Sequence, residues 1–247
     1  MITVLLSMVP LILERVVFGS AEHWIPIVVG LIFGGGIIVF ANQKLNKRQQ
    51  HLLIHALAVV VSLIVISFHL HKFSLGTYDI QKDLPLYLCS LLAIIMPIFT
   101  HYRKYWMYEI LVFWIIAGTL QAICTPDIAT GFPTFDYLRY WAVHVGLLIV
   151  IFYATFVFKM APKFKSIFKS ILALQIYVLM MVVINYLLNA NYFYLNQKPK
   201  SASLLDYFGE WPLYIIVVQL ILVPYFLLIY LPFYLANKNT KLDKLPN

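Results

Sequence analysis

The residue best suited to covalent chemistry is Cys89, which lies in the stretch DLPLYLCS just ahead of the apolar run LLAIIMPIFT. Pro85 fits the first turn of a helix, where its missing N–H has no partner to lose, so we expect a membrane helix over residues 84–101. The thiol then lies about one and a half turns, or about 6–8 Å, inside this helix, within reach of a lipid ester carbonyl. The alternative is that Cys89 only packs, as most lone cysteines in apolar helices do.

His144, in the stretch RYWAVHVG, is the residue best placed to serve Cys89 as a base. We expect a helix over residues 137–158 that enters the membrane from the same side, which puts His144 about 10 Å deep. The thiolate is the reactive form of cysteine, and a neighbouring imidazole can generate it and later return the proton. The alternative is a structural histidine, bonded to a carbonyl or to Tyr140 one turn earlier.

Further polar residues lie near the same ends of the predicted helices and are candidates for contacts with a substrate. Gln121, Asn185 or the N–H groups of helix ends can donate hydrogen bonds to a developing oxyanion. For Asp127, capping of its own loop is the simpler role. The candidate substrate-binding residues are His23, His69, Gln121, Asp127, Tyr140, Asn185 and Trp211.

A metal site is the competing interpretation of the histidines at this face. His23, His69 and His71 would have to join His144 as ligands, but no H-x-x-x-H or H-E-x-x-H spacing occurs there. We therefore expect neither a metal ion nor another cofactor.

The composition is that of a polytopic membrane protein. Of the 247 residues, 62% are hydrophobic and only 11% are charged, and the mean hydropathy is +0.86. Soluble domains contain about 25% charged residues. Two cysteines do not make a disulfide framework. The net charge of +8 resolves into charges of the loops, so we expect no nucleic-acid partner.

The sequence predicts an all-α membrane helix bundle with about seven transmembrane helices. Pro10 and the pair Glu14-Arg15 interrupt residues 1–19, for which we expect an interfacial or re-entrant helix. The Gly-x-x-x-Gly spacing within GLIFGGG is typical of close helix packing. We expect one integral membrane domain over residues 1–247, made of an outer segment (1–23), a helix bundle (24–235) and a basic cytoplasmic tail (236–247). The predicted spans are 24–42, 51–71, 84–101, 106–124, 137–158, 167–188 and 212–235.

The loop charges predict the orientation. Lysine and arginine gather in alternate loops and in the C-terminal tail, while the other loops are neutral or acidic. Cytoplasmic loops carry the excess of Lys and Arg, so we expect a cytoplasmic C-terminus and place Cys89 and His144 near the outer leaflet. The outer loop over residues 189–211 is longer than most connections and can form a lid over this face.

Four stretches together resemble a known family. LPLYLC, YEILVFWIIAGTLQAICTPDI, FPTFDYLRYWAVHVG and NYLLNANYFYLNQKPKSASLLDYFGEWPLY are similar, in this order, to the YwaF family of bacterial integral membrane proteins. That family is related to the vertebrate transmembrane protein 164, a phospholipid acyltransferase, and more distantly to androgen-induced hydrolases of fatty-acid esters. The resemblance implies a multi-pass protein of the bacterial plasma membrane. It also implies a membrane-embedded cysteine with a histidine, at Cys89 and His144 by motif position.

The leading functional prediction is a lipid acyltransferase or transacylase. Cys89 would attack a phospholipid ester, His144 would act as base and then acid, and the acyl chain would pass to a lysolipid. Phospholipids and lysolipids are then the expected partners. A lipid ester hydrolase with the same pair is one alternative, and a seven-helix transporter or lipid-binding membrane module without catalysis is the other. Cys89→Ser separates them, because it should abolish acyl transfer and barely disturb transport or binding.

Overall fold

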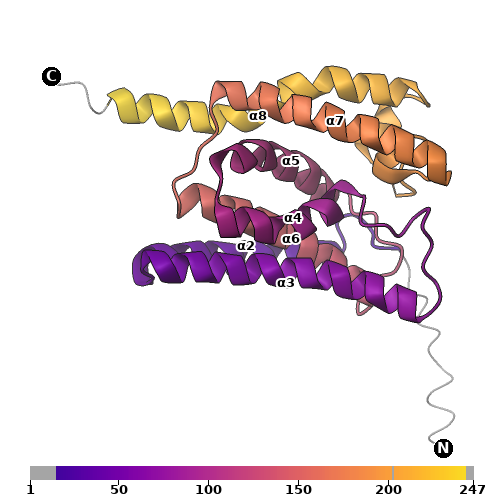
Figure 1. The fold of residues 1–247 in the computed structure, drawn as a ribbon, viewed down its shortest axis with the longest axis horizontal. Coiled ribbons are helices and arrows are strands. Elements are labelled where there is room, and N and C mark those ends of the chain that lie inside the picture. Colours follow the sequence, from indigo (N-terminus) through magenta and orange to yellow (C-terminus); the bar gives the residue numbers. More distant parts are fainter. Residues whose placement is uncertain (1–14, 202, 243–247) are drawn as a thin grey trace, which may run out of the picture.

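A computed structural model describes residues 15–201 and 203–242, and this part of the chain contains helices and no strand (Figure 1). The predicted all-α, polytopic helix bundle is therefore confirmed. The α-helices are α2 (Ala21–Lys44), α3 (Lys47–Ser74), α4 (Leu88–Tyr102), α5 (Tyr105–Cys124), α6 (Phe135–Phe156), α7 (Phe164–Leu188) and α8 (Leu213–Leu242). Two short 3-10 helices, η1 (Tyr192–Tyr194) and η2 (Leu204–Phe208), lie between α7 and α8.

Within the described residues, six of these helices are long and apolar enough to cross a membrane. The remaining α-helix, α4, is also apolar but shorter. With 15 residues, α4 is about 22 Å long, which is less than the hydrocarbon thickness of about 30 Å. Non-helical backbone at this depth is tolerated only where it is buried in protein or lines a cavity. The segment before α4 therefore needs partners from the rest of the bundle.

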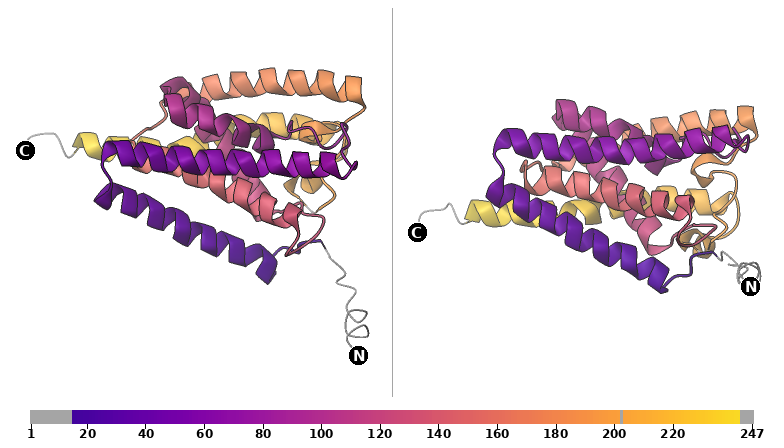
Figure 2. Two further views of the ribbon diagram at one scale, coloured as in Figure 1. Left: turned by 60° about the horizontal axis from the view of Figure 1, so that its bottom comes forward. Right: turned by 90° about the horizontal axis from the view of Figure 1, so that it is seen from below.

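The helices stack in layers, with α5 and α6 at the centre (Figure 1). Helix α3 packs against α4 and α6, α5 packs against α6 and α7, and α8 packs against α7 and α5. Helix α2 contacts α6 and lies inclined on the outside of the bundle (Figure 2). In the most apolar stretch of each helix, more than half of the residues of α5 and α6 are buried, whereas 11% of those of α2 are. The outer helices thus present apolar side chains to lipid.

Small residues permit the contact between α2 and α6. A Cβ atom at Gly30 would lie 2.5 Å from Val145, and one at Gly34 would lie 2.7 Å from Ile149. Side chains cannot approach so closely, so these two positions accept only glycine without a shift of α6. The packing role predicted for the Gly-x-x-x-Gly spacing is confirmed.

The connections divide between two ends of the bundle. The long-loop end carries residues 15–20, 75–87, 125–134 and 189–212. The short-loop end carries residues 45–46, 103–104 and 157–163 and receives the end of α8. The candidate residues of the sequence analysis lie toward the long-loop end, and the basic loops lie at the short-loop end.

The start of α4 differs from the prediction. Pro85 was expected in the first turn, but the helix begins at Leu88 with Tyr87 as its N-cap, and Pro85 lies in the segment before it. Cys89 is consequently the second residue of the helix, not one and a half turns inside it. The predicted depth was wrong in this respect.

Distant tyrosines explain the late start. The Tyr177 hydroxyl donates to the Leu86 carbonyl oxygen at 2.5 Å, and the Leu84 N–H donates to the Tyr192 hydroxyl at 3.0 Å. The Leu86 N–H closes a tight turn onto the Leu84 carbonyl at 2.7 Å. The Leu84 and Leu86 carbonyl oxygens are acceptors that a longer α4 would have used itself, whereas the Leu84 N–H would have no partner within such a helix. Residues 84–87 are thus held as a partly buried, non-helical segment that leads into the helix.

The helix predicted over residues 1–19 lies mostly outside the described residues. In the described part, Arg15 to Ser20 is not helical. The Val16 N–H bonds the Ile128 carbonyl oxygen at 3.3 Å, so this short segment runs along the loop that follows α5.

Candidate functional site

Cys89 carries a free thiol at the N-terminal end of α4 and is partly exposed, although its neighbours Leu88 and Ser90 are buried. The Thr119 hydroxyl of α5 lies close to the sulfur but has no hydrogen bond of good geometry in the described chain. Tyr177 of α7 lies within electrostatic range as well. The residue therefore keeps some accessible surface, although side chains of α5 and α7 lie near its sulfur.

The first turn of α4 adds unused donors beside this thiol. The Leu91 N–H bonds the Tyr87 carbonyl oxygen at 3.0 Å and begins the helical ladder. In the described chain, the N–H groups of Leu88, Cys89 and Ser90 have no acceptor, and Tyr87 offers no side-chain cap. The N-terminus of a helix favours negative charge through such free N–H groups. This end of α4 can therefore stabilise an anion that forms at or near the sulfur.

His144 is buried in α6, and its ring nitrogens are distinguishable. Nδ1 lies 2.6 Å from the Tyr140 carbonyl oxygen one turn earlier. A carbonyl only accepts, so Nδ1 carries the proton and Nε2 of the neutral ring keeps its lone pair. Nε2 has no partner in the described chain and is not among its fully enclosed polar atoms. His144 is thus a histidine held by a carbonyl, as the structural interpretation expected, and its free nitrogen is the one that can accept a proton.

Tyr140 is a neighbour of both candidate catalytic residues. Its ring centroid lies 4.1 Å from that of His144, and its hydroxyl donates to the Ala122 carbonyl oxygen at 2.8 Å. Tyr140 is also within electrostatic range of the Cys89 sulfur. Among the described residues, no hydrogen bond joins Cys89 to His144 directly. The structure brings both to the same neighbourhood, around Tyr140.

Sequence reasoning missed Arg139, which lies five residues before His144 on α6. Its charge acts on the Cys89 thiol and on His144. Its Nη2 donates to the Asp136 carboxylate at 2.6 Å, and its guanidinium carbon lies 4.2 Å from the centre of the Phe68 ring. The available signal was a permanent charge inside a predicted membrane helix, since such charges usually mark a functional pathway.

His69 of α3 lies beside this arginine. Both of its ring nitrogens are fully enclosed and lack a hydrogen-bond partner in the described chain. The ring makes edge contacts with Phe68 and Tyr78, and the charge of Arg139 acts on it. Of the candidate substrate-binding residues, His69 shares the neighbour Arg139 with Cys89 and His144, and Asp127 shares Tyr140 with them.

Other candidate residues are bonded within the fold. His23 accepts from the Gly19 N–H at 3.0 Å and bonds the Ile123 carbonyl oxygen at 2.8 Å, which ties α2 to the end of α5. Gln121 donates to the Thr125 hydroxyl at 2.7 Å, one turn later on α5.

Asn185 at the end of α7 bonds both backbone groups of Tyr192, at 2.9 Å and 2.7 Å. It is buried, so this amide is a clamp between α7 and the loop that follows. The Tyr192 hydroxyl in turn donates to the Ile80 carbonyl oxygen at 2.6 Å. Burial raises the pKa of Tyr192 to about 12, and the phenol remains a donor at neutral pH.

Asp127 and Trp211 hold the loop over residues 189–212. Asp127 forms an ion pair with Arg15 and accepts from the Ser201 N–H and the Tyr194 hydroxyl, each at 3.2 Å. Burial, followed by the charge of Asp127, raises the pKa of Tyr194. Trp211 donates to a loop carbonyl at 3.1 Å and is itself 60% exposed. The loop is thereby fastened to the N-terminal segment and to the loop after α5.

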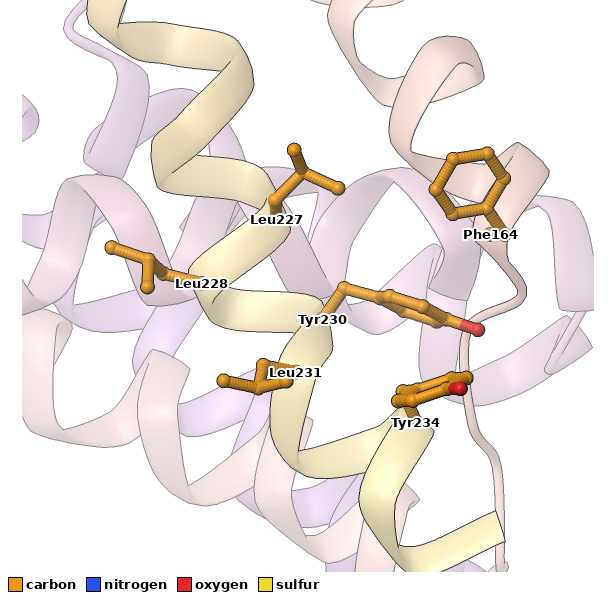
Figure 3. A pocket seen from close by; sticks show the side chains of 6 residues that line it. All are labelled: Phe164, Leu227, Leu228, Tyr230, Leu231 and Tyr234. Carbon is orange, nitrogen blue, oxygen red and sulfur yellow. The ribbon is translucent and has the colours of Figure 1, made fainter. Parts of the chain in front are cut away.

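A separate groove lies at the short-loop end, where the start of α7 faces α8 (Figure 3). Its volume is about 360 Å³, and its walls are almost entirely apolar. The lining residues are Phe164, Leu227, Leu228, Tyr230, Leu231 and Tyr234. None of them is a candidate catalytic residue, so this groove is distinct from the surroundings of Cys89.

Over the described residues, no group of three or more His, Cys, Asp or Glu side chains is arranged to hold a metal ion. No curated protein and no solved structure matches the chain. One family model matches, that of the TMEM164 family, and it covers residues 17–230. The relation to transmembrane protein 164 expected from the four stretches is confirmed, although the model does not carry the YwaF name. The chain is a member of the TMEM164 family.

Proposed function

We propose that this protein is a membrane-embedded lipid acyltransferase that uses Cys89 as nucleophile and His144 as general base and acid. The observation that carries the proposal is the tautomer of His144. Its Nδ1 is fixed by the Tyr140 carbonyl, and its free Nε2 lies beside a tyrosine that also neighbours the Cys89 thiol. A free base nitrogen near a free thiol is what nucleophilic catalysis by cysteine requires.

The reaction proceeds in two acyl transfers. Nε2 of His144 takes the thiol proton, and the Cys89 sulfur attacks the ester carbonyl carbon of a phospholipid. The ester C–O bond breaks, the leaving lysolipid oxygen receives the proton from His144, and the acyl chain remains on sulfur as a thioester. The acceptor hydroxyl of another lysolipid then loses its proton to His144 and attacks the thioester carbonyl carbon. The C–S bond breaks, and the released Cys89 sulfur receives the proton from His144. Catalytic hydrogen bonds often form only once substrate is bound, so the missing bond between the two residues fits this proposal.

The N-terminus of α4 supplies the third element of the site. In each transfer, the carbonyl oxygen becomes an oxyanion that needs hydrogen-bond donors. The free N–H groups of Cys89 and Ser90 lie next to the sulfur and supply such donors. Gln121 is less suited to this role, because its amide already donates to Thr125.

Transfer is favoured over hydrolysis by the surroundings of the thiol. Cys89 has the side chains of Thr119, Tyr140 and Tyr177 around it, all on membrane helices. Water reaches such a site less readily than the hydroxyl of an amphiphilic lysolipid does. The basic residues at the short-loop end support a cytoplasmic C-terminus, with the site facing the outer leaflet of the cell membrane. Phospholipids and lysolipids of that leaflet are the proposed substrates.

The test is acyl trapping in lipid nanodiscs. Purified protein is incubated with a diacyl phospholipid that carries a labelled acyl chain, and peptides are analysed by mass spectrometry for a thioester. Labelled diacyl product from added lysolipid is measured in parallel. Wild type is compared with Cys89→Ser and His144→Gln, and Cys124→Ser is the matched control because Cys124 is also a free cysteine of the described chain.

We expect the label on Cys89, no product from Cys89→Ser, a large loss in His144→Gln, and full activity in the Cys124 variant. Labelled fatty acid in place of diacyl product would identify a hydrolase. An unlabelled Cys89 with unchanged lipids in folded protein would refute the catalytic proposal in favour of a transporter or lipid-binding module.

A further inference from the structure

Arg139 has hydrogen-bonding capacity that the described chain leaves unused. The guanidinium has five N–H donors and no acceptor. One partner is bonded to it, the Asp136 carboxylate, through Nη2 at 2.6 Å. Nη1 has no partner among the described residues, and Nε is fully enclosed without one. The side chain is only 18% exposed, so bulk water does not satisfy these donors in full.

The arginine is also held in place from one side. The Phe68 ring of α3 lies 4.2 Å from the guanidinium carbon and covers one of its faces. Asp136 is one turn earlier on α6 and fixes one end of the group. A guanidinium held by stacking and by one ion pair loses little further freedom when an anion binds to its remaining N–H groups. This is a prepared anion site.

A second polar group, His69 of α3, lies beside Arg139. It follows Phe68 in the chain, and neither of its ring nitrogens has a hydrogen bond of good geometry in the described residues, although the Asp83 backbone lies close to the ring. A buried polar atom without a hydrogen bond costs about 1–3 kcal/mol, so a ligand that accepts from this imidazole is favoured. Lys72 does not compete for such a ligand, because Asp83 binds its ammonium group at 2.5 Å.

Depth in the bilayer identifies the anion. Arg139 is the fifth residue of α6, so it lies about 6 Å inside the helix at the long-loop end, where lipid headgroups lie. Among the components of a bilayer, the phosphate of a phospholipid suits this position, and the open Nη1 of Arg139 can donate a charge-assisted hydrogen bond to it. A phosphate on Arg139 would also lie close to Cys89 and His144, since the charge of Arg139 acts on both.

We propose that Arg139, assisted by His69, binds the headgroup phosphate of the phospholipid and thereby positions an acyl ester of the same molecule against Cys89. In a glycerophospholipid, the phosphate and the nearest acyl ester are attached to adjacent glycerol carbons, which suits this arrangement. The inference rests on the proposed function and deepens it, because it makes a phosphate group the feature by which the site selects its lipid.

Binding can be measured without any chemistry. Cys89→Ser protein in detergent is titrated with a phospholipid that carries ether-linked chains and so has no ester to transfer, and complexes are counted by native mass spectrometry. The neutral ether-linked diglyceride and inorganic phosphate are the comparison ligands. Arg139→Gln, Arg139→Lys and His69→Gln are made in the same background. Arg103→Gln is the matched control, because Arg103 also stacks on an aromatic ring but lies at the short-loop end.

We expect the phospholipid to bind more tightly than the diglyceride, and Arg139→Gln to lose about 10–100-fold in phospholipid affinity with no loss for the diglyceride. His69→Gln should lose less, Arg139→Lys should retain part of the affinity, and Arg103→Gln should match the parent. Equal affinity for phospholipid and diglyceride in the parent would overturn the proposal without any variant. Full displacement of the phospholipid by inorganic phosphate would overturn the lipid as ligand and leave a site for free phosphate.

The binding experiment and the acyl-trapping experiment test the two proposals separately. Phosphate-dependent binding in a protein whose Cys89 never acquires an acyl chain would support the headgroup site and refute the acyltransferase. Acyl transfer with an unchanged affinity in folded Arg139→Gln would do the reverse.

Discussion

Replacing Tyr192 by phenylalanine should destabilise the whole long-loop end. The Tyr192 hydroxyl donates to the Ile80 carbonyl oxygen at 2.6 Å and accepts from the Leu84 N–H at 3.0 Å. The side chain is fully buried, while both of its hydrogen bonds are partly buried. Tyr192→Phe keeps the ring and its packing and removes only these two bonds.

The magnitude follows from the two backbone groups that lose their partner. A buried donor or acceptor without a hydrogen bond costs about 1–3 kcal/mol. Both bonds are only partly buried, and Ile80 is 55% exposed, so the pair costs about 1–3 kcal/mol in total. For a chain of this length, each kcal/mol lowers the melting temperature by about 2–4 °C, so we expect a melting temperature about 2–12 °C below that of wild type.

The assay is thermal unfolding in detergent, followed by the reactivity of the two free cysteines with a thiol reagent. Tyr186→Phe is the control, because Tyr186 is 87% exposed and makes no hydrogen bond in the described chain. The Tyr192→Phe protein should also label faster at Cys89 below its melting temperature, since residues 84–87 would be less firmly held. Equal melting temperatures for the Tyr192 and Tyr186 variants would refute the reasoning that these bonds fix the lead into α4.

Two further changes probe the packing of the bundle and its loops. Gly146→Ala should lower the free energy of unfolding by about 1–3 kcal/mol, because its Cβ atom would collide with Val61 of α3. Gly36→Ala is the control, since its Cβ atom meets open space and the variant should unfold at the wild-type temperature. Equal melting temperatures for the two variants would show that α3 and α6 separate readily. Asp127→Asn weakens the ion pair with Arg15 and should speed proteolysis within residues 189–212 in nanodiscs, and an unchanged cleavage rate would mean that other contacts hold this loop.

Hydropathy was enough to predict most of the fold. A run of about 20 apolar residues in lipid forms a helix that spans the hydrocarbon core. Helices such as α5 and α6 therefore begin and end close to their predicted limits. The start of α4 was beyond such reasoning. It depends on Tyr177 and Tyr192, which lie about a hundred residues later and bond the backbone before the helix. Local sequence preference cannot reveal bonds of this kind.

The candidate site was predictable in outline only. Counting spans placed Cys89 and His144 at one end of the bundle, which is where they lie. The same reasoning selected His23 and Asn185, whose side chains are bonded to backbone groups within the fold. In the sequence, a polar residue in an apolar helix looks the same whether it stabilises the fold or binds a ligand. The two roles are distinguished only by the partners that its side chain has in the structure. Arg139 gave a signal of its own, because a permanent charge inside a predicted membrane helix usually marks a functional pathway.

The shortness of α4 also bears on how the chain is made. A segment of 15 residues is a weak candidate for stable insertion by itself, so α4 depends on α3 and α5 as they leave the ribosome. The non-helical segment before α4 can form its hydrogen bonds with Tyr177 and Tyr192 only after these residues have been synthesised. The reactive end is therefore assembled only after α7 and the loop beyond it have been translated. A nascent chain that stalls before that point carries its thiol without the two phenols, Tyr177 and Tyr192, that hold the segment before α4.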